Sequence, residues 1–256
     1  MARYFDINQP GYSVKCKLYC DSPREVEHCI IFLHGFGGHK DNKAAERFAE
    51  NVHSKMKRTA VLTFDWPCHG KDVRRKLTLD DCKIYLKLVL NYVKEELDPV
   101  DIFAYGTSFG AYLTLKYIYE EGNPFKKIVL RAAAITMYES MLERIMTPEN
   151  KALIDRGKEA LVGFDRKVKV DKNFIEELRE HDIRKNDYID FAEDILMVHG
   201  EKDEIIPVDE VKKFADDNVI ECIVVKNADH RFQNLDLLKL AHSYFIKFYE
   251  TAARKK

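Results

Sequence analysis

Short, largely apolar runs recur along this 256-residue chain, each followed by a turn or by a stretch with helical periodicity. Runs of this kind, without polar residues at every second position, are typical of strands buried on both faces of a parallel sheet. They lie at residues 29–33, 59–64, 100–105, 127–134, 195–198 and 220–225. Strands that alternate with helices in this way predict a doubly wound, mostly parallel α/β sheet with helices on both faces.

The helices and one edge of the sheet carry separate signals. Thr78 and Asp81 have the spacing of a helix N-terminus at which a threonine side chain caps the helix. Apolar residues then recur at steps of three and four as far as Leu97, which is typical of a helix with one buried face. Residues 12–20 alternate apolar and polar side chains, so we expect a half-exposed antiparallel strand near the sheet edge.

The alternation of strands and helices breaks between residues 136 and 190, where 24 of 55 residues are charged. We interpret residues 136–190 as a lid or cap insertion of short helices and a hairpin near residues 161–170, folded over the strand ends. The α/β core domain would then consist of residues 1–135 and 191–256. The alternative is a solvated helical excursion that has no role in function.

Ser108 stands between two glycines, directly after the apolar run at residues 100–105. In a Gly-x-Ser-x-Gly pattern the serine occupies a strained strand-to-helix turn, and a side chain at Gly106 or Gly110 would collide with neighbouring backbone. The hydroxyl is then held out above the sheet, which predicts a nucleophile. A serine in this position can also be an ordinary helix cap. The catalytic interpretation therefore needs an acid and a base at the same sheet edge.

Asp203 and His230 follow the last two predicted strands, and the carboxyl ends of parallel strands meet at one edge of a sheet. His230 is the candidate base, because an imidazole with a pKa of about 6.5 can take the serine proton and return it to a leaving group. Asp203 is the candidate acid that orients the imidazole. Glu201 and Glu204 flank Asp203 and are the substitutes for it.

Other polar residues at strand ends have simpler interpretations. His34 precedes a glycine-rich turn, and we expect it to order that turn. His199 ends a buried strand and is interpreted as structural. Asp65 and His69 are expected to brace a loop through hydrogen bonds, as polar residues at strand ends commonly do.

The chain order Ser108, Asp203, His230 is the order used by α/β-hydrolases, and the sequence resembles that superfamily along nearly all of its length. The resemblance is carried by His34-Gly35-Phe36-Gly37-Gly38, Asp65-x-x-x-His69-Gly70, Gly106-Thr107-Ser108-Phe109-Gly110, His199-Gly200-x-x-Asp203 and Asp229-His230. It implies the α/β-hydrolase fold and a Ser-His-Asp catalytic triad. It also implies an oxyanion hole formed by the backbone N–H groups of Phe36 and Phe109.

A narrower resemblance concerns residues 136–190, where the run Val168-Lys169-Val170-Asp171-x-x-Phe174 is similar to the small lid of cinnamoyl and feruloyl esterases. This resemblance implies a serine esterase that cleaves small to medium esters, aromatic acyl esters among them, through an acyl-enzyme intermediate. Thioesterase, lysophospholipase or amidase activity would use the same triad. A non-catalytic ligand-binding protein with this fold is the alternative from another class. The candidates for an apolar substrate pocket are Trp66, Met137, Met141 and Met146.

Charge and composition narrow the partners. The 42 basic and 43 acidic residues give a net charge of −1, which does not favour nucleic acid or an anionic membrane as partner. No signal peptide and no apolar run of about 18 residues is evident, so we expect no membrane span and a cytoplasmic location. The six cysteines form no CxxC pair, and we expect reduced thiols, no metal and no cofactor. The expected partner is a small-molecule ester. The sequence leaves open whether the protein forms a homodimer.

Overall fold

The computed structural model describes residues 2–253 and contains an eight-stranded sheet with the strand order β1-β2-β4-β3-β5-β6-β9-β10. Its strands are β1 (Ala2–Gln9), β2 (Tyr12–Tyr19), β3 (His28–Leu33), β4 (Thr59–Phe64), β5 (Asp101–Thr107), β6 (Lys127–Arg131), β9 (Ile195–Gly200) and β10 (Glu221–Val225). The strands from β4 to β10 in this order are parallel, and β1 and β2 pair antiparallel. The predicted doubly wound, mostly parallel sheet is confirmed.

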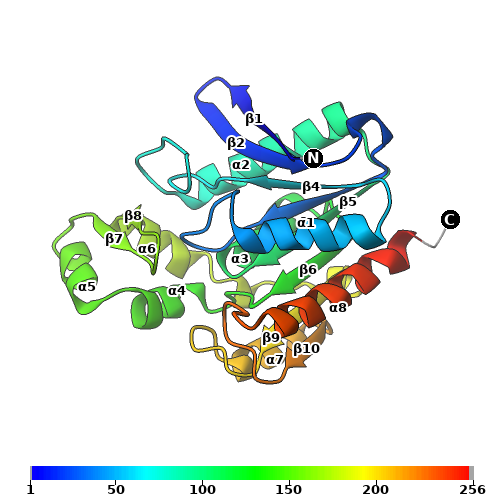
Figure 1. Cartoon of the computed structure of the whole chain (residues 1–256). Helices are drawn as coiled ribbons and strands as arrows, with labels where there is room; N and C mark the ends of the chain where they lie inside the picture. Colours follow the sequence, from blue (N-terminus) through cyan, green and yellow to red (C-terminus); the bar gives the residue numbers. More distant parts are fainter. Residues whose placement is uncertain (1, 254–256) are drawn as a thin grey trace.

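Helices cover both faces of this sheet (Figure 1). Helices α1 (Lys43–Lys55) and α8 (Leu235–Ala253) pack apolar side chains against one face. Helices α2 (Leu79–Tyr92), α3 (Phe109–Glu121) and α7 (Val208–Asp217) contribute to the apolar cluster on the other face. Helix α2 begins at the predicted cap, where the Thr78 hydroxyl accepts a hydrogen bond from Asp81 N, and continues as the π-helix η2 (Val93–Leu97). No helix within residues 2–253 is long and apolar enough to cross a membrane.

The edge of the sheet contains one strand that the sequence did not indicate. The predicted antiparallel strand is present as β2, and β1 pairs with it along its whole length. Ile7 is the one buried residue of β1, so this strand lacks the apolar signal of the others. Backbone pairing with β2 places β1 there, and its mostly exposed side chains are typical of an outer strand.

The segment between β6 and β9 contains short elements and one hairpin. They are α4 (Met137–Ser140), η3 (Met141–Ile145), α5 (Pro148–Asp155), β7 (Ala160–Val162), β8 (Val168–Val170), α6 (Lys172–Glu180), η4 (Ile183–Lys185) and η5 (Ile189–Asp194). Another short helix, η1, covers Pro23–Glu25. Strands β7 and β8 pair antiparallel, so the predicted hairpin is confirmed. Figure 1 shows α4, α5, α6, β7 and β8, in green to yellow-green, beside the sheet rather than on its faces.

Candidate active site

Ser108 lies at the turn between β5 and α3, with backbone angles φ 52° and ψ −116°. This conformation is rare for a residue with a side chain and costs about 1–3 kcal/mol, so neighbouring contacts must hold it. Ser108 N donates to Arg131 O at 3.0 Å, and Ala111 N donates to Ser108 O at 3.0 Å. Although Ser108 is the N-cap residue of α3, its side chain makes no capping hydrogen bond. The helix-cap interpretation therefore does not explain the serine.

The glycines on either side of Ser108 are required by close backbone contacts. A Cβ atom at Gly110 would lie 2.0 Å from Leu33 O, and one at Gly106 would lie 2.8 Å from Ala111 Cα. Neither backbone atom can move without separating α3 from the sheet. The predicted steric reason for both glycines is confirmed, and the turn projects Ser108 at the carboxyl end of β5.

His230 connects the serine to an acid. The Ser108 hydroxyl donates to His230 Nε2 across 3.0 Å. Because a carboxylate can only accept, His230 Nδ1 is the protonated nitrogen, and it lies 3.0 Å from Asp203 Oδ1 and 2.8 Å from Asp203 Oδ2. Asp203 follows β9, and His230 lies in the loop between β10 and α8. The structure thus brings together the three side chains that the sequence singles out as nucleophile, base and acid.

The side chain of Asp203 is fully buried and accepts several hydrogen bonds. Ile205 N and Ile206 N donate to its Oδ1 at 2.9 Å and 2.8 Å. Burial acts to raise the pKa of Asp203, but the hydrogen bond and charge of His230, the charge of His199 and the Ile206 N–H outweigh burial and hold it below the ordinary value. The acid is therefore ionised, as a partner for an imidazolium must be.

The substitute acids do not touch the His230 ring. Glu201 accepts from Asn227 N at 3.0 Å, and Glu204 accepts from the backbone N of His230 at 3.3 Å. His199 is buried, donates to the Ile206 carbonyl at 2.9 Å and lies 3.2 Å from Asp203 Oδ2. It belongs to the surroundings of the acid, in keeping with the structural interpretation.

His34 has both ring nitrogens occupied in the turn that follows β3. Trp66 N donates to His34 Nε2 at 3.3 Å, so Nδ1 is the protonated nitrogen and donates to Gly35 O at 2.9 Å. Burial, and then the charge of His69, lower the pKa of His34 well below its usual value. The neutral His34 ring uses both nitrogens for hydrogen bonds in this region, so it orders the turn, as expected. Asp65 likewise braces its loop by accepting from Lys71 N at 2.9 Å, and it also accepts from Lys40 N at 2.7 Å.

The residues expected to form an oxyanion hole lie next to Ser108. Phe109 follows the serine and is the first residue of α3, so no preceding turn of the helix supplies an acceptor for its N–H group. Gly35, the neighbour of Phe36, lies against the nucleophile, since a Cβ atom there would be 3.2 Å from Ser108 Cβ. The rings of Phe36 and Phe109 meet edge to face, with centroids 5.8 Å apart.

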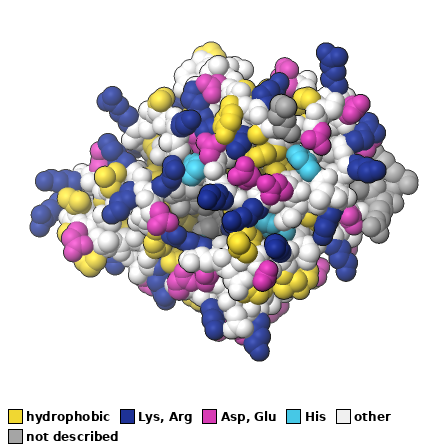
Figure 2. Space-filling view, viewed as in Figure 1, with side chains coloured by type: hydrophobic (Ala, Val, Ile, Leu, Met, Phe, Trp, Pro, Cys, Tyr) yellow, Lys and Arg dark blue, Asp and Glu magenta, His cyan; other side chains and the backbone are white. Residues whose placement is uncertain are grey.

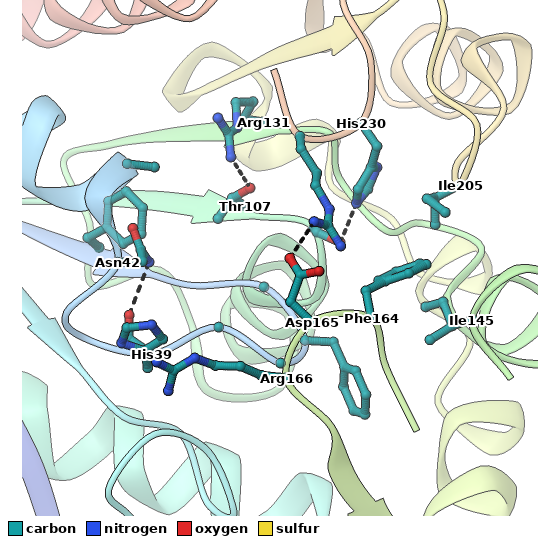
Figure 3. A pocket seen from close by; sticks show the side chains of 18 residues that line it. His39, Asn42, Thr107, Arg131, Ile145, Phe164, Asp165, Arg166, Ile205 and His230 are labelled. Atoms are coloured by element: carbon teal, nitrogen blue, oxygen red, sulfur yellow. Dashed lines mark hydrogen bonds and ion pairs between the residues drawn. The ribbon is translucent and has the colours of Figure 1, made fainter. Parts of the chain in front are cut away.

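A cavity of about 340 Å³ opens beside Ser108 and His230. Figure 2 shows a hollow in the middle of this face, with Lys and Arg side chains at its edge. The segment between β6 and β9 contributes Ile145, Phe164, Asp165 and Arg166 to the lining. In Figure 3, Ile145, Phe164 and Ile205 lie together on one side of the cavity, whereas Thr107 and Arg131 lie apart from them.

Three contacts hold the loop between β7 and β8 beside the cavity. Arg231 Nη1 donates to Asp165 Oδ2 at 2.8 Å, and the Arg231 guanidinium lies 4.9 Å from the centre of the Phe164 ring. Arg166 O is so close to Gly37 that a Cβ atom there would lie 2.7 Å from it. The hairpin tip therefore rests on the glycine-rich turn and on the loop that carries His230.

The four predicted pocket residues lie elsewhere. Trp66, Met137, Met141 and Met146 are buried in the apolar core and are not among the residues that line this cavity. Trp66 Nε1 donates to His34 O at 3.0 Å, so the indole supports the turn instead of facing a ligand. The methionines anchor the segment between β6 and β9 to the core, because their apolar side chains turn inward and leave the charged residues outside.

Sequence reasoning also missed residues that line the cavity. Arg131, Thr107 and Ile205 were not singled out, and neither were Phe164 and Arg231. Arg131 had a signal, because a charged residue at the end of the apolar strand Ile128–Leu130 needs an explanation. Among residues 2–253, no three His, Cys, Asp or Glu side chains are grouped so that they could hold a metal ion.

Residues 29–160 match the family model described as alpha/beta hydrolase fold. Two similar solved structures are Est1E from Butyrivibrio proteoclasticus, at 21% identity, TM-score 0.77 and coverage of 98% of this chain and 99% of that chain, and Est1E with ferulic acid bound, at 22% identity, TM-score 0.78 and coverage of 98% and 100%. Alpha/beta hydrolase domain-containing protein 10 from mouse is 17% identical, with a TM-score of 0.69 and coverage of 97% and 99%. No curated protein matches this chain in sequence.

Proposed function

This chain belongs to the alpha/beta hydrolase fold family, and we propose that it is a serine hydrolase that cleaves carboxylic esters of small to medium size. The observation that carries the proposal is the hydrogen-bonded series from Ser108 through His230 to Asp203, beside a cavity. A volume of about 340 Å³ lies at the small end of ligand pockets, which span about 300–1,000 Å³. This size supports small to medium substrates.

The first half of the reaction forms an acyl-enzyme. His230 Nε2 takes the proton of the Ser108 hydroxyl as Oγ attacks the ester carbonyl, and the carbonyl oxygen becomes an oxyanion. Asp203 stabilises the imidazolium that results. The tetrahedral intermediate then collapses, and the Nε2 proton goes to the leaving alcohol. Water then takes the place of the alcohol and gives a proton to His230 Nε2 as it attacks the acyl carbonyl. The second tetrahedral intermediate collapses, His230 returns the proton to Ser108 Oγ, and the carboxylic acid leaves.

The oxyanion needs donors that are in place before the reaction, because fixed dipoles cost no reorganisation when charge develops. We assign this role to the backbone N–H groups of Phe36 and Phe109. Their support is the contact between the Gly35 turn and Ser108 and the position of Phe109 at the start of α3. The loss of one such donor commonly costs about 3–4 kcal/mol in the transition state.

Residues 136–190 are proposed to act as a lid over the core formed by residues 1–135 and 191–256. The support is that Ile145, Phe164 and Arg166 line the cavity, and that Arg231 ties the hairpin tip to the loop of the base. Aromatic acyl groups are included in the proposal through the likeness to Est1E, whose structure holds ferulic acid. Thioesters and amides could be attacked by the same series, so they belong in the substrate panel.

The test is turnover of p-nitrophenyl esters by Ser108→Ala. We expect the variant to lose activity by about 10⁴-fold or more, since removal of a triad member leaves only binding and the oxyanion donors. Ser243→Ala is the matched control, because Ser243 is half-buried on α8, far from Ser108 in the chain, and its hydroxyl donates to Leu240 O of the same helix. Equal circular dichroism spectra would establish that both variants fold. Unchanged turnover by Ser108→Ala would refute the proposal.

A further inference from the structure

Arg131 is a buried cation for which the described residues provide no counter-ion. Its side chain ends β6 and is 5% exposed. Nη2 donates to Thr107 Oγ1 at 3.0 Å, and the guanidinium lies 5.3 Å from the centre of the Phe232 ring. Nε and Nη1 are buried without a hydrogen-bond partner, and no carboxylate within residues 2–253 forms an ion pair with Arg131.

An arrangement of this kind is costly, because burial of a charge is tolerated when the charge is paired and hydrogen-bonded. Nearby groups do not relieve it. Asn51 Nδ2 donates to His242 Nδ1 at 3.0 Å, so the buried and unpaired His242 Nε2 carries the proton and is one more donor. Burial and then the charge of Arg131 lower the pKa of His242 to about 3. The buried Tyr105 hydroxyl also interacts with Arg131 and has no hydrogen-bond partner, but it is neutral and cannot serve as a counter-ion. This region therefore has positive charge that no anion among the described residues balances.

The uncompensated charge lies at the cavity and close to the nucleophile. Arg131 and Thr107 both line the cavity, and Arg131 O accepts the hydrogen bond from Ser108 N at 3.0 Å. Three arginines line the cavity against one carboxylate, Asp165, which Arg231 already pairs. The Thr107 hydroxyl accepts from Arg131, so its own proton is free for a ligand.

We propose that the side of the cavity formed by Arg131 and Thr107 binds a small anionic group, a carboxylate or a phosphate monoester, that the substrate carries near its scissile ester bond. This inference rests on the proposed ester hydrolysis and specifies its substrate class. The anion supplies the missing counter-charge, while the apolar side at Ile145, Phe164 and Ile205 receives the uncharged part of the substrate (Figure 3). The preferred substrates are then half-esters of short dicarboxylic acids and esters of comparable charge.

Matched pairs of esters test this preference in the unmodified protein. For an anion on the acyl side, the pair is p-nitrophenyl hemiglutarate and its uncharged methyl ester. For an anion on the alcohol side, the pair is acetoxybutyrate and acetoxybutyramide. We expect kcat/KM to be about tenfold or more higher for the charged member of one pair, as charge-assisted hydrogen bonds produce. Equal or lower kcat/KM for the charged member in both pairs would overturn the inference.

Variants of Arg131 locate the preference. Arg131→Met should reduce the ratio of kcat/KM between charged and uncharged esters by about tenfold or more, and Arg131→Lys should retain part of it. Thr107→Val is the second variant if Arg131→Met does not fold, and it should reduce the same ratio. A ratio that stays at the wild-type value in folded Arg131→Met would contradict the assignment of this residue.

Binding measurements separate this inference from the proposed hydrolysis. Glutarate and inorganic phosphate are titrated calorimetrically into Ser108→Ala, with and without Arg131→Met. We expect one or both anions to bind in an Arg131-dependent manner, and the tighter anion identifies the group. Arg131-dependent binding without any ester turnover would refute the hydrolase and retain the anion site. Turnover of neutral esters without anion binding would retain the hydrolase and refute the anion site.

Discussion

Ser108 Oγ lies 3.0 Å from His230 Nε2, although the two residues are 122 positions apart in the chain. A serine at the N-cap of a helix ordinarily accepts a hydrogen bond from the helix backbone, but Ser108 makes no such bond. Its hydroxyl is directed to an imidazole that Asp203 already holds. This relationship separates a nucleophile from a structural cap, and the predictions below depend on it.

Asp203→Asn should lower kcat for p-nitrophenyl esters by about 10³- to 10⁴-fold, an effect known for the corresponding aspartate in chymotrypsin-like proteases. The amide keeps the size of the side chain but can donate to His230 Nδ1, which favours the wrong tautomer. Glu201→Gln is the control, because Glu201 accepts from Asn227 N and does not touch the His230 ring. Equal losses in both variants would show that Asp203 has no special role.

Gly110→Ala should abolish turnover and lower the free energy of unfolding by more than about 3 kcal/mol, because the new Cβ would lie 2.0 Å from Leu33 O. Gly157→Ala is the comparison, since Gly157 has φ +70° and open space around it. That variant should lose only about 1 kcal/mol, the cost of a left-handed backbone conformation for alanine. Chemical denaturation measures both changes, and a Gly110→Ala protein of wild-type stability would contradict the close contact.

Ile205→Ala and Met141→Ala should separate specificity from stability. Ile205 lines the cavity, so its truncation should reduce the preference for longer apolar esters over short ones by about tenfold, measured as a ratio of kcat/KM. Met141 is fully buried in the core and does not line the cavity, so its truncation should cost about 2–5 kcal/mol of stability. Its ester preference should stay unchanged. A change in preference in Met141→Ala would return that residue to the substrate pocket.

Acid should destabilise the protein partly through His242. Burial and the charge of Arg131 lower its pKa in the folded state to about 3, below the ordinary histidine value of 6.5. The unfolded chain therefore binds this proton first, and the contribution to stability present above about pH 6.5 is lost as pH falls towards about 3. Between about pH 7.5 and about pH 5 the loss amounts to about 2 kcal/mol.

His242→Phe checks this assignment. The ring would remain among Phe48, Tyr105 and Phe245, so the aromatic packing is preserved. Urea unfolding at both pH values should give a free-energy difference about 2 kcal/mol smaller in the variant than in the wild type. An identical pH dependence in the two proteins would show that His242 is not the group that titrates.

The order of the elements could be predicted because it is written in local patterns. The buried strand at residues 59–64 and the cap at Thr78 each depend on neighbouring residues alone. Strand β1 could not be predicted, because its exposed side chains leave no apolar pattern and only its pairing with β2 makes it a strand. Local chemistry thus specifies the interior strands, whereas the edge depends on a partner.

The same distinction applies to the site. Ser108, Asp203 and His230 could be selected because each stands at a strand end, and parallel strands bring those ends together. The residues that line the cavity could not be predicted, because the lining depends on the direction in which each side chain points. The sequence suggests Met141 as a contact for a ligand, but its side chain is buried in the core. Arg131 stands at the end of an apolar strand in the sequence, and in the structure it lines the cavity.

Labelling with a fluorophosphonate probe tests the central claim, that His230 and Asp203 make Ser108 a nucleophile. We expect stoichiometric labelling of the folded protein, with the adduct on the peptide that contains Ser108, and loss of labelling in Ser108→Ala and His230→Ala. Intact-protein and peptide mass spectrometry measure both. A folded protein that is not labelled, or that is labelled at another residue, would show that Ser108 is not the activated nucleophile.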